Sequence, residues 1–142
     1  MNPRPLTSPR LTLRYVPDVP TFELTSHGRC GVYHLKLNGH HVGAVSLTGI
    51  SDGHWEIGYE IEQPYRGQGI ASEAVGAVVE GLGIGMLSAQ TRVDNLASRR
   101  VLEKAGFTLA SSKLVWPYGE DAPMQIMAYR LLAPAAHEDI HG

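Results

Sequence analysis

The stretch of residues 56–72 constrains the fold most, because the spacing of its apolar residues changes from that of a strand to that of a helix within a few positions. Apolar and polar side chains alternate over residues 55–62, which is the period of a β-strand. Pro64 has no N–H to donate to a ladder, so we expect the strand to end before it. Over residues 70–82 the apolar side chains recur at helical spacing. The stretch therefore predicts a strand, a loop and a helix.

The predicted loop has the sequence Arg66-Gly67-Gln68-Gly69. Its glycines leave consecutive backbone N–H groups uncovered at the positive end of the helix, which is a suitable place for a phosphate group. A tight strand-to-helix turn without a ligand is the alternative. The third glycine of the dinucleotide fingerprint is replaced by Ser72, and no Lys-Ser or Lys-Thr pair follows the loop. The loop thus matches neither a dinucleotide-binding fingerprint nor a nucleoside-triphosphate P-loop.

Composition limits the possible classes of protein. With 142 residues, 43% of them hydrophobic, the chain suits a single domain over residues 1–142 with one core. Charged residues make up 18% and the net charge is −2, which argues against a nucleic-acid-binding protein. No stretch approaches the roughly 18 apolar residues of a membrane span, so no membrane partner is expected. Cys30 is the single cysteine and cannot form an internal disulfide, which favours a cytoplasmic location.

Metal binding is not predicted, although the chain has seven histidines. None of them has a convincing zinc-ligand spacing. His40 and His41 are adjacent and would point to opposite faces of a strand. His137 and His141 lie in a polar tail.

The residues before the central stretch predict an antiparallel meander. Asn38-Gly39 between two apolar runs is a strong signal for a two-residue hairpin. The three prolines in residues 1–10 indicate a poorly ordered arm or an extended edge segment, and Pro17 should end the first strand. Strands are expected at residues 11–16, 22–25, 32–37 and 41–47.

The central helix and the elements after it complete the pattern. In the helix, Gly76 suggests a close approach to the sheet, and Glu73 and Glu80 are expected on the solvent face. A second helix over residues 96–104 should begin at Asn95 and close at Gly106. Further strands are expected at residues 86–93, 107–110, 113–116 and 124–132, and a less ordered tail at residues 133–142.

Two separated motifs carry a family resemblance. The order Arg-x-x-Gly-x-Ala at residues 66–71 is followed by Asn95-Leu96-Ala97-Ser98-Arg99-Arg100-Val101-Leu102-Glu103-Lys104-Ala105-Gly106-Phe107. Together, in this order and spacing, they closely resemble the GNAT acetyltransferases, and most nearly the ribosomal-protein N-terminal acetyltransferase branch. The resemblance covers residues 42–132.

The resemblance implies a fold and a cosubstrate site. The fold is a mixed α/β domain whose mostly antiparallel sheet splays between its fourth and fifth strands, is flanked by helices and binds acetyl-CoA in the opening. The pantetheine arm would pair with the strand edge at Ile61, and Asn95 and Ser98 would lie beside it. The family pattern assigns the pyrophosphate to the backbone amides of Arg66, Gly67, Gln68, Gly69, Ile70 and Ala71. No metal is implied.

The resemblance also implies the reaction: direct transfer of an acetyl group to a primary amine in a ternary complex. Glu56 matches the position of the base in several members. The alternatives are Glu60 and Glu62, which lie on the same strand face, or water alone. Many members protonate the thiolate with a tyrosine where this chain has Leu102, which leaves Ser98 as the expected donor. Tyr118 and Tyr129 are less favoured donors.

Several questions stay open at this level. The acceptor is a peptide or protein α-amine or a small-molecule amine. Family members usually carry one or two helices where this chain has residues 17–29, so the acceptor pocket is either open or completed by the second subunit of a homodimer. A catalytically weak acyl-CoA-binding or regulatory protein with the same fold is the alternative function, which Leu102 and the reduced N-terminal helices favour.

Overall fold

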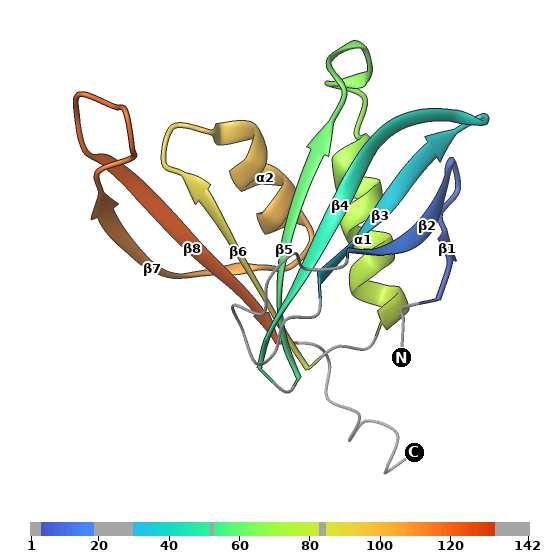
Figure 1. The fold of residues 1–142 in the computed structure, drawn as a ribbon, viewed down its shortest axis with the longest axis horizontal. Helices are drawn as coiled ribbons and strands as arrows, with labels where there is room; N and C mark the ends of the chain where they lie inside the picture. Colours follow the sequence, from blue (N-terminus) through green and yellow to red (C-terminus); the bar gives the residue numbers. More distant parts are fainter. Residues whose placement is uncertain (1–3, 19–29, 52, 83–84, 133–142) are drawn as a thin grey trace.

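One mixed sheet runs through the domain in the strand order β1-β2-β3-β4-β5-β6-β8-β7, with two α-helices beside it (Figure 1). The computed structural model describes residues 4–18, 30–51, 53–82 and 85–132. The strands are β1 (Leu6–Thr7), β2 (Leu11–Asp18), β3 (Cys30–Leu37), β4 (His40–Ser51), β5 (His54–Ile61), β6 (Met86–Arg92), β7 (Thr108–Val115) and β8 (Met124–Leu132). The helices are α1 (Ile70–Leu82), α2 (Leu96–Lys104) and the short 3₁₀ helix η1 (Gln63–Tyr65). This is the mixed α/β fold that the sequence predicts.

The first half of the sheet is the expected meander. Asn38 and Gly39 both have positive φ, 52° and 82°, which is the conformation of a two-residue hairpin turn between β3 and β4. The expectation that Pro17 ends β2 is wrong, since Pro17 pairs with Gly31. The neighbouring strand β1 pairs only with Leu13 and Thr12, so β2 is an edge strand at Pro17, where proline is tolerated.

The sheet opens between β5 and β6, which are its fourth and fifth strands when the two-residue strand β1 is not counted, as the resemblance implies. These two strands are parallel and pair at three positions, the last being Glu56 with Ser88. Beyond that point they separate, and Figure 1 shows the two halves of the sheet as the arms of a V. The short parallel pairing is therefore what creates the opening.

Helix α1 packs on the half-sheet that contains β1, β2 and β5. Its buried face consists of Ile70, Ala74, Val75 and Val78. The close approach expected at Gly76 is wrong, because a Cβ there would meet no atom within 4 Å. The close approach occurs instead at Gly81, where a Cβ would lie 2.4 Å from Leu6 Cδ2.

The C-terminal half of the sheet differs from the prediction in one strand. Residues 107–110 and 113–116 were expected as two strands, whereas β7 is one strand with a shift of register between Leu109 and Ser111. The strand expected at residues 22–25 and the tail at 133–142 lie outside the described residues. No helix in the described ranges is both long and apolar enough to span a membrane.

Candidate active site

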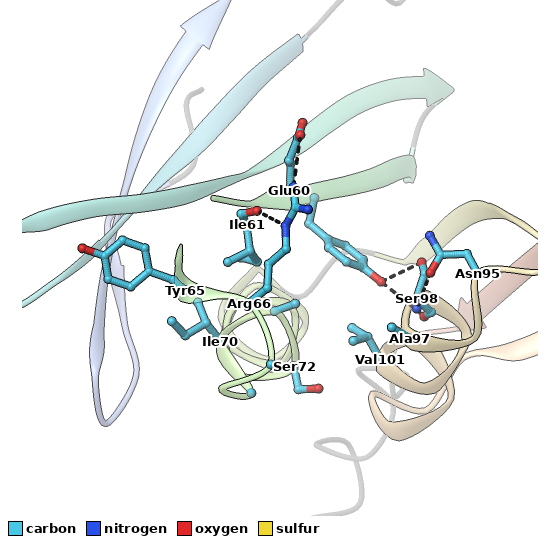
Figure 2. A pocket seen from close by; sticks show the side chains of 14 residues that line it. Glu60, Ile61, Tyr65, Arg66, Ile70, Ser72, Asn95, Ala97, Ser98 and Val101 are labelled. Atoms are coloured by element: carbon cyan, nitrogen blue, oxygen red, sulfur yellow. Dashed lines mark hydrogen bonds and ion pairs between the residues drawn. The ribbon is translucent and has the colours of Figure 1, made fainter. Parts of the chain in front are cut away.

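A cleft of about 550 Å³ lies between the end of β5, the glycine loop with the start of α1, and the start of α2 (Figure 2). Its lining residues are Tyr59, Glu60, Ile61, Tyr65, Arg66, Gly67, Gly69, Ile70, Ala71, Ser72, Asn95, Ala97, Ser98 and Val101. The cleft thus brings together both sequence motifs, which are about 25 residues apart in the chain.

The glycine loop presents backbone donors to this cleft. Gly67 and Gly69 have φ values of 78° and 77°, which favour glycine over residues with a side chain. The first bond of α1 runs from Glu73 N to Gly69 O. The amides of Ile70 and Ala71 therefore precede the first intrahelical bond and point out of the helix end. Their orientation suits an anion at this end of the cleft.

Gln68 differs from its neighbours in the loop. It is not among the residues that line the cleft. Its side-chain amide lies 3.5 Å from Pro64 O, and its own carbonyl accepts a bond of 3.0 Å from Arg10 Nη2. The N-terminal segment therefore contacts the loop at Gln68, outside the cleft.

The same segment holds the start of α1 through Glu73. This carboxylate accepts bonds of 2.7 Å from Arg10 N and from Arg10 Nε, and it also accepts the Ser8 hydroxyl. Burial tends to raise the pKa of Glu73, but the bonds from Ser8 and Arg10 bring it below its ordinary value. Glu73 is therefore outside the buried face of α1, as expected, but the N-terminal segment covers most of its side chain, which is 16% exposed. Glu80, expected there as well, is exposed.

The edge of β5 directs backbone groups into the opening. Glu62 N donates to Val42 O, which places the backbone bonds of every second residue on the β4 side. By this alternation, the N–H and C=O groups of Tyr59 and Ile61 point into the opening. The Ile61 carbonyl there accepts a bond of 2.8 Å from Arg66 Nε, visible in Figure 2.

Asn95 and Ser98 begin α2 on the other side of the cleft. Asn95 Oδ1 accepts a bond of 3.0 Å from Ser98 N, so the expected N-cap at Asn95 is confirmed. At the other end of α2, Gly106 has a φ of 101° and donates to Glu103 O, which is the expected glycine closure.

Tyr59 crosses the opening to Ser98. The Tyr59 hydroxyl lies 2.8 Å from Ser98 Oγ and donates to Ser98 O at 3.2 Å. Burial raises the pKa of Tyr59, while the bond with Ser98 acts in the opposite direction. The phenol therefore remains protonated at neutral pH. Sequence reasoning missed this residue, because Tyr59 alternates with Ile57 and Ile61 and so resembles a core position.

The other candidate proton donors lie elsewhere. Leu102 is 1% exposed and belongs to the core, so its position one turn after Ser98 does not face the cleft. Tyr118 is fully exposed in the turn before β8. Tyr129 is buried, donates to Glu103 Oε2 at 3.0 Å and accepts from Arg99 Nε at 3.2 Å. Neither tyrosine lines the cleft.

The three carboxylates of β5 are in different environments. Glu60 lines the cleft, and its carboxylate is 4.0 Å from Arg66 Nη2. Glu62 accepts from His41 Nδ1 at 3.0 Å. Glu56 does not line the cleft but lies where β5 and β6 part, next to the His54 Nε2 and Ser88 Oγ pair, which is 2.9 Å apart.

Comparison with known proteins identifies the family. The family model described as Acetyltransferase (GNAT) domain matches residues 8–108. The chain belongs to the GNAT acetyltransferase family. Within this GNAT domain, no group of three or more His, Cys, Asp or Glu side chains among the described residues is placed to hold a metal ion.

Individual relatives support this placement. An N-acetyltransferase of Bacillus subtilis strain 168, YoaA, described as uncharacterized, is 30% identical over 99 residues, which are 66% of this chain and 56% of YoaA. The GNAT domain also resembles RimL, a ribosomal L7/L12 α-N-protein acetyltransferase in complex with coenzyme A. The TM-score is 0.65 and the identity 24%, covering 72% of this chain and 62% of RimL.

A third relative matches over more of the chain. Mycobacterium smegmatis RimJ, in complex with CoA-disulfide, has a TM-score of 0.72 at 18% identity, covering 91% of this chain and 86% of RimJ. At these identities the structural likenesses concern the fold. The chain spans little more than half the length of YoaA and 62% of the RimL chain.

Proposed function

We propose that this GNAT protein is an acetyl-CoA-dependent N-acetyltransferase that acts on a primary amine. The observation that carries the proposal is the cleft in which the glycine loop, the free edge of β5 and the Asn95–Ser98 helix start converge. Family relatives that bind coenzyme A, such as RimL, support the choice of cosubstrate.

The donor groups of the cleft fit the parts of acetyl-CoA. Of the amides of residues 66–71, that of Arg66 already donates to Gln63 O at 3.2 Å, so those of residues 67–71 are expected to hold the pyrophosphate. Charge-assisted bonds of this kind contribute about 1.5–3 kcal/mol each. The Ile61 N–H and the Tyr59 carbonyl on the β5 edge are expected to pair with the amide-bearing pantetheine arm as a further strand would. The Asn95 side chain keeps its NH₂ group for the same arm, because only its Oδ1 is used in the cap.

When bound, acetyl-CoA supplies an acetyl thioester. The new bond joins the acceptor nitrogen to the acetyl carbon, the carbon–sulfur bond breaks, the nitrogen loses a proton and the sulfur gains one. The chain must therefore provide a proton acceptor near the amine and a proton donor near the sulfur. A backbone N–H on the β5 edge, such as that of Tyr59, is placed to polarise the carbonyl.

Tyr59, which contacts the proposed proton donor, and Glu56, the proposed base, lie on opposite faces of β5. Tyr59 shares the helix-covered face with Ile57 and Ile61 and reaches Ser98, the donor that the proposal assigns to the thiolate. Glu56 and Glu60 share the other face by strand alternation. The amine then approaches from the face opposite the helices, with Glu56 as its proposed base and Glu60, Glu62 or water as alternatives.

The decisive experiment incubates the purified protein with acetyl-CoA and a panel of peptides and small amines, and measures free thiol together with acetylated product. Thiol release coupled to a product 42 Da heavier than an acceptor supports the enzyme. Coenzyme A binding without transfer to any acceptor supports instead an acyl-CoA-binding or regulatory protein, the function that Leu102 favours.

The proposal also includes a homodimer and a cytoplasmic location. Edge strand β7 carries Leu109 and Leu114 at 51% and 65% exposure, with Trp116 just beyond it at 65%, and such an apolar edge suits pairing with a second copy. A monomer mass by light scattering at micromolar concentration would contradict the homodimer. The location rests on the single cysteine and is tested by cell fractionation.

A further inference from the structure

A second cavity, of about 590 Å³, lies over β1, β2, β3 and the start of β4. It shares no lining residue with the cleft. Its lining includes two cationic side chains, Arg14 and Lys36, and two imidazoles, His34 and His41. No carboxylate-bearing residue lines it, and the remaining lining is largely apolar. We refer to it as the basic groove.

The positive charges of Arg14 and Lys36 are not neutralised by a described carboxylate. Among the described side chains, the carboxylate within salt-bridge distance of a basic-groove residue is Glu62, which accepts from His41 Nδ1 at 3.0 Å. His34 Nδ1 in turn lies 3.3 Å from His41 Nε2. Arg14 and Lys36 are exposed, and neither forms an ion pair with a described carboxylate. The basic groove is thus a cationic surface that suits an anionic ligand.

The basic groove is connected to the cleft by one row of paired residues across the sheet. Arg14 pairs with His34, His34 with Ala44, and Ala44 with Glu60. Directly paired residues of neighbouring strands point to the same face, so all four lie on the face opposite α1. Arg14 and His34 line the basic groove, and Glu60 lines the cleft.

The side chains between the two ends of this row are small. Ala44 stands between the basic and acidic ends of the row, and in the next row Ser46 pairs with Gly58. Three strand spacings of about 4.8 Å separate Arg14 from Glu60, or about 14 Å in total. An extended peptide rises by about 3.3 Å per residue, so this distance corresponds to about four residues.

We infer that the basic groove binds acidic side chains of a peptide acceptor whose N-terminal amine lies beside β5. Counted from an amine beside Glu60, the 14 Å span places the acidic residues at about the third to fifth positions of the peptide. This inference rests on the proposed acetyltransferase function and names the acceptor class of the same site. The carboxylates of β5 attract the cationic amine, and the basic groove selects the acidic segment that follows it.

Nucleic acid is a less suitable occupant. Two cationic side chains in a chain of net charge −2 provide far less positive charge than a phosphate backbone requires. The β5 carboxylates at the other end of the row would repel a polyanion. Peptide carboxylates, which are few and spaced, match the arrangement.

The test uses hexapeptides of one sequence with a free α-amine and with Glu, Gln or Lys at positions three to five. The wild type is expected to acetylate the Glu peptide about three- to tenfold more efficiently, in kcat/KM, than the Lys peptide at low salt, with the preference reduced at high salt. Lys36→Glu and Arg14→Glu should each weaken the preference, and the double variant should reverse it. The Gln peptide should be affected little by any of these substitutions.

The matched control is Lys113→Glu, a lysine that is likewise exposed on a strand but lies on β7 at the other edge of the sheet. It should leave the preference unchanged. Equal kcat/KM for the Glu and Lys peptides, or equal effects of Lys36→Glu and Lys113→Glu, would overturn the inference while leaving acetyl transfer intact.

Direct binding separates this inference from the proposed function. Fluorescence anisotropy of the same peptides, labelled at the C-terminus, measures their binding to the basic groove without turnover. Tighter binding of the Glu peptide that is lost in the Arg14→Glu/Lys36→Glu variant supports the basic groove even if no acceptor is acetylated. Competition by polyuridylate that exceeds competition by the Glu peptide at equal charge would indicate a nucleic-acid surface and overturn it.

Discussion

The hydroxyl of Tyr59 lies 2.8 Å from the hydroxyl of Ser98 and joins the splayed strand β5 to the first turn of α2. This pair supplies a phenol to the cleft in a chain whose α2 carries Leu102 where many GNAT members have a tyrosine. The phenol comes from the opposite wall of the cleft and ends beside Ser98, one turn before Leu102. We propose that the Tyr59 and Ser98 hydroxyls together take the role that this tyrosine has in other members.

Tyr59→Phe is expected to lower kcat by about 10- to 100-fold with a small change in the KM for acetyl-CoA, because a hydrogen bond to a developing charge is worth about 1.5–3 kcal/mol. Steady-state kinetics with thiol detection measures both constants. Tyr118→Phe removes a hydroxyl from a fully exposed ring and serves as the control. An unchanged kcat in Tyr59→Phe would show that the Tyr59 hydroxyl takes no part in the reaction and that the ring only packs.

Ser98→Ala should also lower kcat with acetyl-CoA still bound. Since Tyr59 and Ser98 are directly bonded, the double variant should lose little more activity than the more damaging single variant. The double-mutant cycle measures this coupling. Additive losses would mean that the two hydroxyls act independently.

Gly69→Val is expected to raise the KM for acetyl-CoA by about tenfold or more, because a β-branched residue at a φ of 77° distorts the loop that presents the amides. Gly119→Val is a matched control: Gly119 has a φ of 82° and lies in the turn before β8. Both variants carry a similar backbone strain. A KM increase of the same size in both would refute the role of the loop.

The lowered pKa of Glu73 predicts that the stability of the folded protein depends on pH. Its pKa is lower in the folded protein than its ordinary value of 4.5, so its contribution is complete above that value and is lost as the pH falls through the folded pKa. Urea unfolding of the wild type should therefore show a free energy of unfolding that decreases below about pH 4.5. Glu73→Gln should flatten this decrease, because the titrating carboxylate is absent.

Glu80→Gln is the control for this measurement, since Glu80 is exposed near the C-terminal end of the same helix. It should retain the acid dependence of the wild type. An equally steep decrease in Glu73→Gln would show that other carboxylates dominate acid unfolding.

The helix bounds and the loop were predictable from sequence, because long periodic segments and glycines are local signals. The predicted helices at 70–82 and 96–104 agree with α1 and α2. The errors concern long-range packing. Gly76 and Gly81 are indistinguishable as helix glycines, and only the position of Leu6 in β1 shows which one is required.

The site was predicted in part for the same reason. Asn95 and Ser98 follow from the motif, and the structure places both in the cleft. Tyr59 could not be recognised, because strand alternation gives a core tyrosine and a cleft tyrosine the same pattern. Its partner Ser98 is 39 residues away in the chain. The contact of Glu73 with Ser8 and Arg10 spans a still longer separation.

The choice of base is tested by comparing two kinds of amine. At pH 7, deprotonating a lysine amine of pKa about 10.4 costs about 4–5 kcal/mol, whereas an α-amine of pKa about 7.8 costs about 1 kcal/mol. A residue that acts as the base should therefore matter more for the lysine amine. Glu56→Gln is expected to reduce kcat/KM for a lysine side-chain acceptor more than for an N-terminal acceptor. Glu60→Gln, on the same face of β5, is the matched comparison. A larger selective loss in Glu60→Gln would assign the base to the carboxylate that lines the cleft, and equal losses for both amines in both variants would leave water as the proton acceptor.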